Sequence, residues 1–454
     1  MPRRVLSKLL SNKFNSSPSK KRMIMSPFHL SQCHRQGTRV LAAMLLVWGA
    51  LVLPAAAQPD LKVLPNLPDA YKVREAQAPA AIQQRLQQTR LEIQREKLLY
   101  NVGFTSVSAL AIKDITGEAE IPAAEVQNLR ARFSTKAFEG AISDDDQDGA
   151  PVSCVTSMTT YDARTSSLVT PIRNQGVCGS CWAFGAVAAY ESSYLKVNGV
   201  APGTVDASEQ HSLNCSGGGT CRGGFAYKVF DWMVSGNRNL CTEAQYAYTA
   251  NDKACSPATC SSPYYAEAWG IVRPDRDISK IASIPDIKQA ICKYGAVSAS
   301  CQVTPKFQDY TNGVFFDFAS NPNNPISNHA VLIVGWCDVR QAWLIKNSWG
   351  TGWGESGYMW IKYNSSNIGR RACWVKAKRG GAQVTLKGYY KGNDGGHYYV
   401  RTVGNKVYWF GEHPNGAFAN VFVGTLSGSQ VTGNFYDVPK GATRGSGVLT
   451  IEIR

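Results

Sequence analysis

One stretch of this chain constrains its fold more than any other. Residues 175–184 read Gln-Gly-Val-Cys-Gly-Ser-Cys-Trp-Ala-Phe and place Cys181 between a glycine-containing loop and an apolar segment. The apolar segment continues to Leu195 and predicts a helix, for which Asn198-Gly199 supplies a stop signal. The N-terminus of a helix carries partial positive charge and unpaired N–H groups, and both favour a thiolate over a thiol. The stretch therefore predicts that Cys181 is a nucleophile at the start of a helix.

A thiolate of this kind needs a partner that holds its proton and later returns it. His329 opens an apolar, β-branched segment that predicts a strand, and Asn347 follows in a Lys-Asn-Ser-Trp motif. An Asn amide can bond the far nitrogen of an imidazole and fix its tautomer. Cys181 and His329 are 148 residues apart (329 − 181), so only folding can bring the three residues together.

Each motif has a simpler interpretation when it stands alone. Cys178-Gly-Ser-Cys181 is a C-x-x-C motif, which fits a redox pair or half of a zinc site. A lone histidine such as His329 is more often structural, and Trp349 can be a core aromatic. A redox or zinc site does not account for the later motifs, so the catalytic interpretation is preferred.

From about Tyr161 to about Lys378, roughly half of its length, the chain resembles the papain (cathepsin-like) family of cysteine proteases. The matching blocks lie at residues 162–175, 175–184 and 209–224 and around His329 and Asn347, in the family's order. The resemblance implies that Cys181 is the nucleophile and that His329 is its general base and acid, forming an ion pair with it. Asn347 would orient His329, and Gln175 would donate to the oxyanion with the N–H of Cys181.

The resemblance also implies a substrate cleft. Gly223 and Gly224 would pair with an extended substrate as an added strand, and Trp349 would shield the His–Asn bond from water. Three residues match positions that line the pocket for the side chain two residues before the cut: Ala226, Asn328 and Ala330. No acid is visible among them, so we expect an apolar side chain at that place. No occluding insertion is evident, which favours an endopeptidase over an exopeptidase.

Thirteen cysteines agree with an exported protein. The resemblance implies the bridges Cys178–Cys221 and Cys215–Cys255. Cys373 fits one end of a further family bridge whose other end is missing here.

The pairing of the other cysteines cannot be read from sequence, although Cys241–Cys260 is the pair that we expect among them. Without Cys33 of the leader and the catalytic Cys181, 11 of the 13 cysteines remain. Because this number is odd, we expect Cys154 to be free or to be lost with the prosegment.

The N-terminal region predicts export. The first 40 residues hold nine Lys or Arg and no Asp or Glu, so they account for most of the net charge of +15. The apolar segment 40–57 ends in Ala-Ala-Ala, and residues 1–57 therefore predict a signal peptide cleaved after Ala57. We expect a secreted, periplasmic or extracellular protein. Anchoring in a membrane by residues 40–57 is the less favoured alternative, because the run is short and Pro54 interrupts it.

Residues 58–155 lie where this family carries a propeptide, and we expect them to inhibit their own protease. Ile82, Leu86 and Ile93 fall on one face of a helix predicted from Ala80 to Leu99. A disordered, cleaved spacer is the alternative. The acidic run 144–149 begins like a calcium loop, but Val155 stands where a bidentate Glu is needed. We interpret this run as a solvated hinge for maturation cleavage, and we expect no metal and no cofactor.

The fold class that we predict is α+β. Residues 156–379 would form a papain-like protease domain with a helical lobe, an antiparallel β lobe and a cleft between them. Residues 380–454 alternate short strands with glycine turns and predict a small all-β barrel or sandwich. Their many aromatic residues would bind polysaccharide or a cell surface, or would fill the small core, which we favour.

The sequence thus predicts a secreted, monomeric cysteine endopeptidase. It would be made as a zymogen and would cleave protein or peptide substrates through a thioester. A peptide ligase or transpeptidase uses the same acyl-enzyme chemistry and remains an alternative. A non-catalytic surface-binding protein is a second alternative, against which the intact catalytic residues argue. No basic stretch with interleaved aromatic residues suggests a nucleic-acid partner.

Overall fold

The computed structural model describes residues 67–133, 154–256, 260–317, 325–379, 386–392, 394–403, 406–427 and 430–452. The predictions for the leader 1–57, its segment 40–57 and the acidic run 144–149 lie outside these ranges. Across the ranges that are described, no helix is both long enough and apolar enough to cross a membrane.

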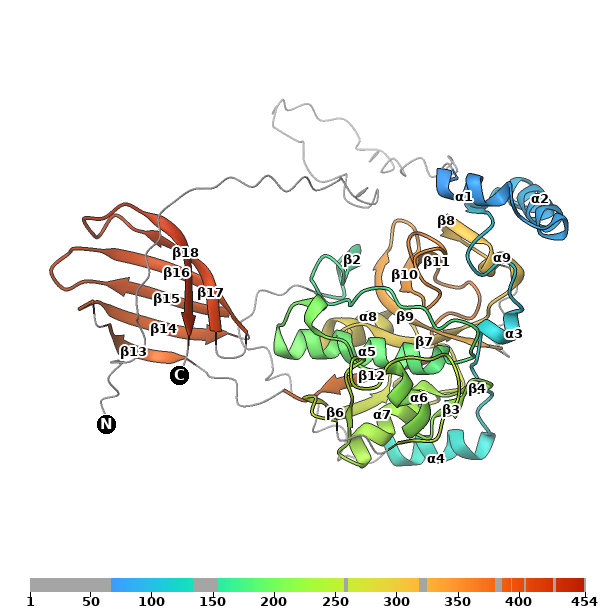
Figure 1. The fold of residues 1–454 in the computed structure, drawn as a ribbon, viewed down its shortest axis with the longest axis horizontal. Helices are drawn as coiled ribbons and strands as arrows, with labels where there is room; N and C mark the ends of the chain where they lie inside the picture. Colours follow the sequence, from blue (N-terminus) through green and yellow to red (C-terminus); the bar gives the residue numbers. More distant parts are fainter. Residues whose placement is uncertain are drawn as a thin grey trace, which may run out of the picture.

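Helix α5, Cys181–Asn198, lies at the centre of the protease region (Figure 1). It packs against strands β9 and β12 and against helices α6 (Glu209–Cys215) and α7 (Ala226–Ser235), so nearly all its side chains are buried. Gly199 ends the helix in the left-handed conformation, with φ of 63°, as Asn198-Gly199 predicted. This packing fixes the position of Cys181, the first residue of the helix.

A ten-stranded sheet carries the other half of the site. Its strand order is β1-β8-β11-β10-β9-β7-β12-β6-β5, with β2 paired to β9, and all pairs except β8–β11 are antiparallel. The bounds are β1 Leu99–Val102, β2 Thr160–Asp162, β5 Asn239–Leu240, β6 Tyr264–Ile271, β7 Val297–Cys301, β8 Tyr310–Phe315, β9 His329–Cys337, β10 Ala342–Lys346, β11 Tyr358–Lys362 and β12 Arg370–Ala377. The short elements are β3 Gly219–Thr220, β4 Gly223–Gly224, η4 Pro202–Thr204, α8 Ile284–Tyr294 and α9 Pro305–Gln308. Strands β9 and β10 are buried along their whole length, which explains their continuous apolar sequences.

The prosegment is folded onto the protease. It forms α1 (Asp69–Glu75), α2 (Ala80–Arg95), β1, α3 (Ile112–Ile115) and α4 (Ala123–Phe133), and β1 extends the protease sheet by pairing with β8. Helix α2 buries the predicted face with Ile82, Leu86 and Ile93, together with Thr89. Arg85 of this helix makes two hydrogen bonds of 2.8 Å to the buried carboxylate of Asp309. The predicted helix is confirmed, although it ends at Arg95 and Leu99 begins β1, and it docks on the protease through both apolar packing and an ion pair.

The C-terminal module is all-β, as predicted. Its strands are β13 Lys387–Lys391, β14 His397–Val403, β15 Lys406–Glu412, β16 Ala419–Ser427, β17 Gln430–Asp437 and β18 Ser446–Glu452. They form one antiparallel sheet in sequence order (Figure 1), and no pairing of β13 with β18 closes it in the described part of the module. Trp409 stacks on Phe422 at 4.0 Å in the core of one face, whereas Tyr389, Tyr399 and Tyr436 are about half exposed. The aromatic residues therefore serve both a core and an exposed face.

Four disulfides join described residues: Cys154–Cys292, Cys178–Cys221, Cys215–Cys255 and Cys241–Cys260. The two bridges implied by the family resemblance and the Cys241–Cys260 pair are confirmed. The expectation that Cys154 is free or lost with the prosegment is wrong, because Cys154 is bonded to helix α8 of the protease. Cys373 is a buried free thiol, as are Cys181 and Cys301.

Candidate active site

Cys181 lies at the junction of the helical half and the sheet half. It is fully buried as the first residue of α5, and its Sγ accepts a hydrogen bond of 3.4 Å from the N–H of Ala330. Ala330 follows His329 at the start of β9. The nucleophile predicted from the helix start thus contacts the strand that begins with the predicted base.

The imidazole of His329 is held in one orientation by its far nitrogen. Nε2 lies 2.8 Å from Oδ1 of Asn347, which follows directly after β10. Oδ1 also accepts the N–H of Ser348 at 2.8 Å, so this atom is an acceptor and Nε2 carries the proton. Nδ1 is buried and has no hydrogen-bond partner, which leaves its lone pair available as a base. The ring of Trp349 covers the imidazole with centroids 4.7 Å apart, as the resemblance implied.

Burial opposes the charged form of both Cys181 and His329. It raises the pKa of the Cys181 thiol to about 12, with a further contribution from the charge of Glu118. It lowers the pKa of His329 to about 4, although the hydrogen bond to Asn347 opposes the shift. Both shifts disfavour the expected thiolate–imidazolium pair, because low-dielectric surroundings penalise the charged forms. We therefore expect the ion pair only where these two residues are uncovered.

Gln175, which we expect to donate to the oxyanion, is already engaged by the prosegment. Its Oε1 accepts from the hydroxyl of Ser348 at 2.6 Å, which fixes the amide. Its Nε2 donates to the carbonyl of Cys178 at 2.7 Å and to the carbonyl of Ile115 at 3.1 Å. The Trp349 indole N–H also donates to the Ile115 carbonyl, at 3.1 Å. A prosegment carbonyl thus takes up the donor that the reaction needs.

Gly224 binds extended backbone, and in this structure the backbone is that of the prosegment, whereas Gly223 pairs with Thr220 between β3 and β4. The N–H of Gly224 donates to the carbonyl of Gly117 at 2.8 Å, and the carbonyl of Gly224 accepts the N–H of Ala119 at 3.3 Å. On the opposite side, the backbone carbonyl of Asn328 accepts the N–H groups of Gly117 and Glu118, both at 2.9 Å. The segment is therefore held by backbone hydrogen bonds from both walls of the cleft.

One small pocket is lined by Ala226, one of the three residues that the resemblance places around the substrate side chain two residues before the cut. Asn328 instead turns its side-chain amide to the backbone of Val303, and Ala330 contacts Cys181. The other residues lining this pocket are Glu118, Phe225, Tyr227, Ser298, Ser300 and Arg371. The apolar expectation considered only those three residues, none of which is acidic, whereas this pocket also contains Arg371 and Glu118 of the prosegment, which form an ion pair of 2.5 Å.

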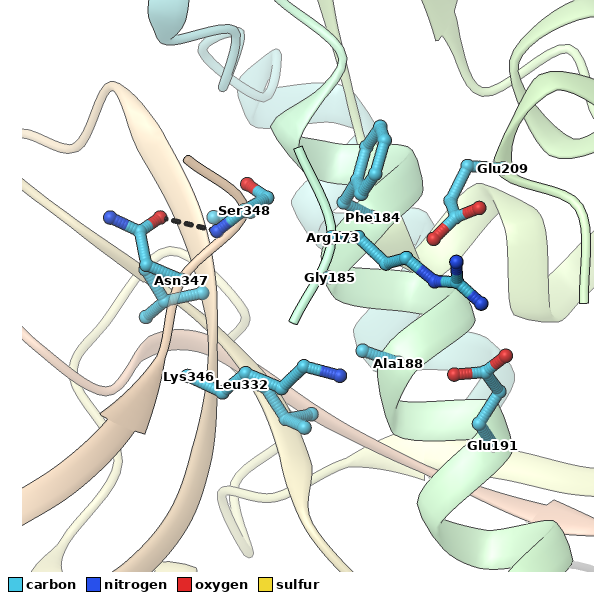
Figure 2. Close-up of a pocket in the computed structure, with 12 residues that line it drawn as sticks. Arg173, Phe184, Gly185, Ala188, Glu191, Glu209, Leu332, Lys346, Asn347 and Ser348 are labelled. Atoms are coloured by element: carbon cyan, nitrogen blue, oxygen red, sulfur yellow. Dashed lines mark hydrogen bonds between the residues drawn. The ribbon is translucent and has the colours of Figure 1, made fainter. Parts of the chain in front are cut away.

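A second small pocket lies behind the catalytic residues, between α5 and strands β9 and β10 (Figure 2). In Figure 2 Glu191, Glu209 and Arg173 lie on one side of it, and Asn347 and Ser348 lie on the other. Lys346 donates to the carbonyl and hydroxyl of Thr170 at 2.9 and 3.0 Å, and the Thr170 hydroxyl donates to Glu191 at 2.5 Å. This buried polar chain connects α5 with the end of β10, next to Asn347, and so supports the position of the catalytic amide.

Only one group in the described residues has the side-chain arrangement of a metal site. It comprises His211, Cys241 and Cys260, and both cysteines are consumed by their mutual disulfide. A bonded pair of sulfurs does not supply thiolate ligands.

The family model for papain family cysteine protease matches residues 158–379. Cysteine proteinase 2 of Entamoeba histolytica is 34% identical over 204 residues, which are 44% of this chain and 61% of the relative. Cathepsin K of Gallus gallus is also 34% identical, over 45% of this chain and 58% of the relative. The chain thus spans about three fifths of the length of these curated relatives. The solved structure of digestive procathepsin L 3 of Tenebrio molitor is 22% identical, with a TM-score of 0.51, over 68% of this chain and 97% of that chain.

The procathepsin match shows the fold and covers more of this chain than the family model does, which agrees with a folded prosegment before the protease region. The order of the motifs, the geometry of Cys181, His329 and Asn347, and the family match over the same residues lead to one conclusion. Residues 158–379 match the papain family of cysteine proteases, and a folded prosegment precedes them.

Proposed function

We propose that the protein is a secreted cysteine endopeptidase made as a zymogen. The observation that carries the proposal is the state of His329, whose Nε2 is bonded to Asn347 while Nδ1 has no partner. An imidazole fixed in this way has one nitrogen available for proton transfer. The proposed nucleophile Cys181 begins the adjoining helix, and its Sγ accepts the N–H of Ala330, the residue that follows His329.

The chemistry follows from these positions once the prosegment has left the cleft. Water then reaches Cys181 and His329, and proton transfer from Sγ to Nδ1 gives the reactive ion pair. Sγ attacks the carbonyl carbon of the substrate, and the oxyanion is bound by Nε2 of Gln175 and the N–H of Cys181. His329 protonates the leaving amine, which releases the first product and leaves a thioester on Cys181. Water, activated by His329, then hydrolyses the thioester.

The prosegment would inhibit the protease by occupying this machinery. Ile115 takes the donor of Gln175, Gly117 takes the N–H of Gly224, and burial neutralises the nucleophile. We propose maturation cleavage between residues 134 and 153. Because the Cys154–Cys292 disulfide lies after this segment, the start of the mature protease would stay attached to α8.

A binding function of the C-terminal module is a second proposal. Tyr389 pairs with Tyr399, Tyr399 with Phe410, Phe410 with Val421 and Val421 with Tyr436, which makes one row across five strands. Tyr389, Tyr399 and Tyr436 in this row are about half exposed. Exposed aromatic rows of this kind suit the faces of sugar rings. Pull-down of the intact protein on insoluble polysaccharide, compared with a Tyr399→Ser variant, tests this, and equal retention of both would reject it.

An activity experiment tests the main proposal. The processed protein is treated with an epoxide-type thiol inhibitor, the labelled residue is identified by mass spectrometry, and casein hydrolysis is measured with and without the inhibitor. We expect a single label on Cys181 and complete loss of hydrolysis. Absence of hydrolysis in the unlabelled protein would instead favour a non-catalytic binding protein. If the protein is instead given short peptides, products longer than those peptides would favour the ligase alternative.

A further inference from the structure

Two acidic residues of the prosegment face two adjacent arginines at the start of β12. Glu118 bonds Arg371, and Glu120 accepts hydrogen bonds of 3.0 Å from both Arg370 and Arg371. The Glu118 and Arg371 side chains are 2% and 4% exposed, whereas that of Glu120 is 61% exposed. Glu118 is therefore the carboxylate that enters the protein, and Glu120 stays at the rim.

Glu118 enters the pocket that contains Ala226. Phe225, Tyr227, Ser298 and Ser300 complete the lining, so Arg371 is the sole cationic residue among the described residues of this pocket. Glu118 pairs through its backbone with Gly224, in the place that an extended substrate would take. Its side chain therefore shows where a substrate carboxylate would lie.

The two arginines differ in what holds them. Arg370 donates to the carbonyl of Ser279 at 2.9 Å and to the hydroxyl of Ser327 at 2.8 Å, and both acceptors belong to the protease. Within the described residues, every hydrogen bond of the Arg371 guanidinium goes to the prosegment, to Glu118, Ala119 and Glu120. Its Nε is buried and has no partner. When the prosegment leaves, the Arg371 guanidinium thus loses all of these hydrogen-bond partners. Arg370 keeps its bonds to Ser279 and Ser327.

The backbone directs Arg371 into the pocket at a cost. Arg371 has φ of 53°, in the left-handed region that non-glycine residues rarely occupy. The register of β12 with β7 shifts between Arg370 and Cys373, which marks a bulge at this residue. Bulges beside active sites re-aim side chains, and strained residues persist where the surroundings hold them. Both features concern Arg371, whose side chain lines the pocket.

We propose that Arg371 makes this pocket select an acidic side chain, Glu above all, two residues before the cut. The inference rests on the proposed peptidase function and replaces the apolar preference expected from sequence. A guanidinium without a partner in a confined pocket is unfavourable, so a neutral side chain leaves its charge uncompensated. A carboxylate restores the pair that Glu118 forms now. Because Glu118 reaches Arg371 at 2.5 Å, a side chain of glutamate length fits.

The test compares peptides that differ only at that place, with Glu, Gln, Leu or Arg, at neutral pH. The processed enzyme is first titrated with the epoxide inhibitor, so that kcat/KM refers to active molecules. We expect Glu to exceed its neutral isostere Gln by about 10- to 150-fold, the range for hydrogen bonds to charged groups. Equal rates for Glu and Gln, or a preference for Leu, would overturn the inference.

Two variants extend the test. Arg371→Met should remove the advantage of Glu over Gln, and Arg371→Glu should reverse it in favour of Arg. Lys376→Met removes the same charge from an outer position of the same strand, where Lys376 contacts Glu267, and should leave the preference unchanged. If the Arg371 variants do not fold, the wild-type peptide series still decides. An enzyme that neither labels nor cleaves any peptide would refute the proposed function, whereas active enzyme without acid preference would refute only this inference.

Discussion

The close contact of Gly117 with the cleft can be tested by a Gly117→Ala substitution, which adds one methyl group. A Cβ at this position would lie 1.8 Å from the carbonyl oxygen of Gly179 and 2.4 Å from its carbonyl carbon. Both atoms are backbone, so no side chain can rotate away. To reach an ordinary contact of 3.4 Å, the Gly117→Ala segment must move by about 1.6 Å. The segment around residue 117 in this variant therefore cannot lie in the position that the wild-type segment occupies.

The magnitude follows from the hydrogen bonds that such a movement breaks. Gly117 accepts from Gly224 at 2.8 Å and donates to Asn328 at 2.9 Å. Each bond contributes about 0.5–1.5 kcal/mol, so the loss of both weakens the binding of the prosegment in the cleft by about 1–3 kcal/mol. The fraction of molecules with an open cleft then rises about 5- to 150-fold, since 1.36 kcal/mol corresponds to a factor of ten.

The assay measures the rate at which the epoxide inhibitor labels Cys181 in the unprocessed chain at early times. Gly103→Ala is the matched control in the same prosegment, because its Cβ would meet the Thr311 side chain at 3.1 Å, which can yield. We expect labelling of Gly117→Ala to be faster by the factor given above, and labelling of Gly103→Ala to match wild type. Equal rates for all three proteins would show that Gly117 does not lie against Gly179.

Three further predictions concern the catalytic residues and the rim. Cys181→Ser should abolish peptide hydrolysis while the melting temperature and circular dichroism stay near wild type, and residual hydrolysis would place the nucleophile elsewhere. Asn347→Ala should lower kcat about 5- to 150-fold with little change in KM, because the buried Nε2 of His329 loses its acceptor. Steady-state kinetics with an unchanged kcat would contradict the proposed role of Asn347 in orienting His329. Partial burial raises the pKa of Glu120, but hydrogen bonds and charges from Arg370 and Arg371 outweigh it and lower the pKa overall. This ion pair therefore stabilises the covered state above the ordinary pKa of a glutamate and is lost as the pH falls through the lowered value. Acidification should therefore speed up inhibitor labelling of Cys181 in the unprocessed wild-type chain by up to about 5-fold more than in Glu120→Gln, since a mostly exposed ion pair contributes at most about 1 kcal/mol. Identical pH profiles of the labelling rate in the two proteins would refute this prediction.

The catalytic centre could be predicted from the sequence because its signals are local. The start of α5 is marked by a loop, a cysteine and an apolar run, and its end by Asn198-Gly199. His329 and Asn347 each border a buried strand whose apolar pattern is visible in a few residues. Those patterns predict where each side chain lies on its helix or strand. The order of the motifs, which matches that of the papain family, predicts that the helix and the two strands form one site.

The charged pocket could not be predicted, because its parts have no local signal. Glu118 and Arg371 are separated by 253 residues, and a bulge, which sequence alternation does not reveal, turns Arg371 inward. The Cys154–Cys292 bridge was missed for a similar reason, since a cysteine count gives parity but not proximity. Such pairings depend on how the prosegment and β12 pack in three dimensions.

The covered site implies that the prosegment acts on reactivity as well as on access. Burial raises the pKa of Cys181 from 9.0 to about 12, which lowers the thiolate fraction at neutral pH by about a thousandfold. Glu118 adds to this shift, because its negative charge lies near the same sulfur. A segment that blocked the cleft without excluding water would leave a reactive thiolate beneath it. The observed segment covers the buried thiol, supplies a like charge and occupies the amide of Gln175, so each of these effects must be reversed before the proposed peptidase can act.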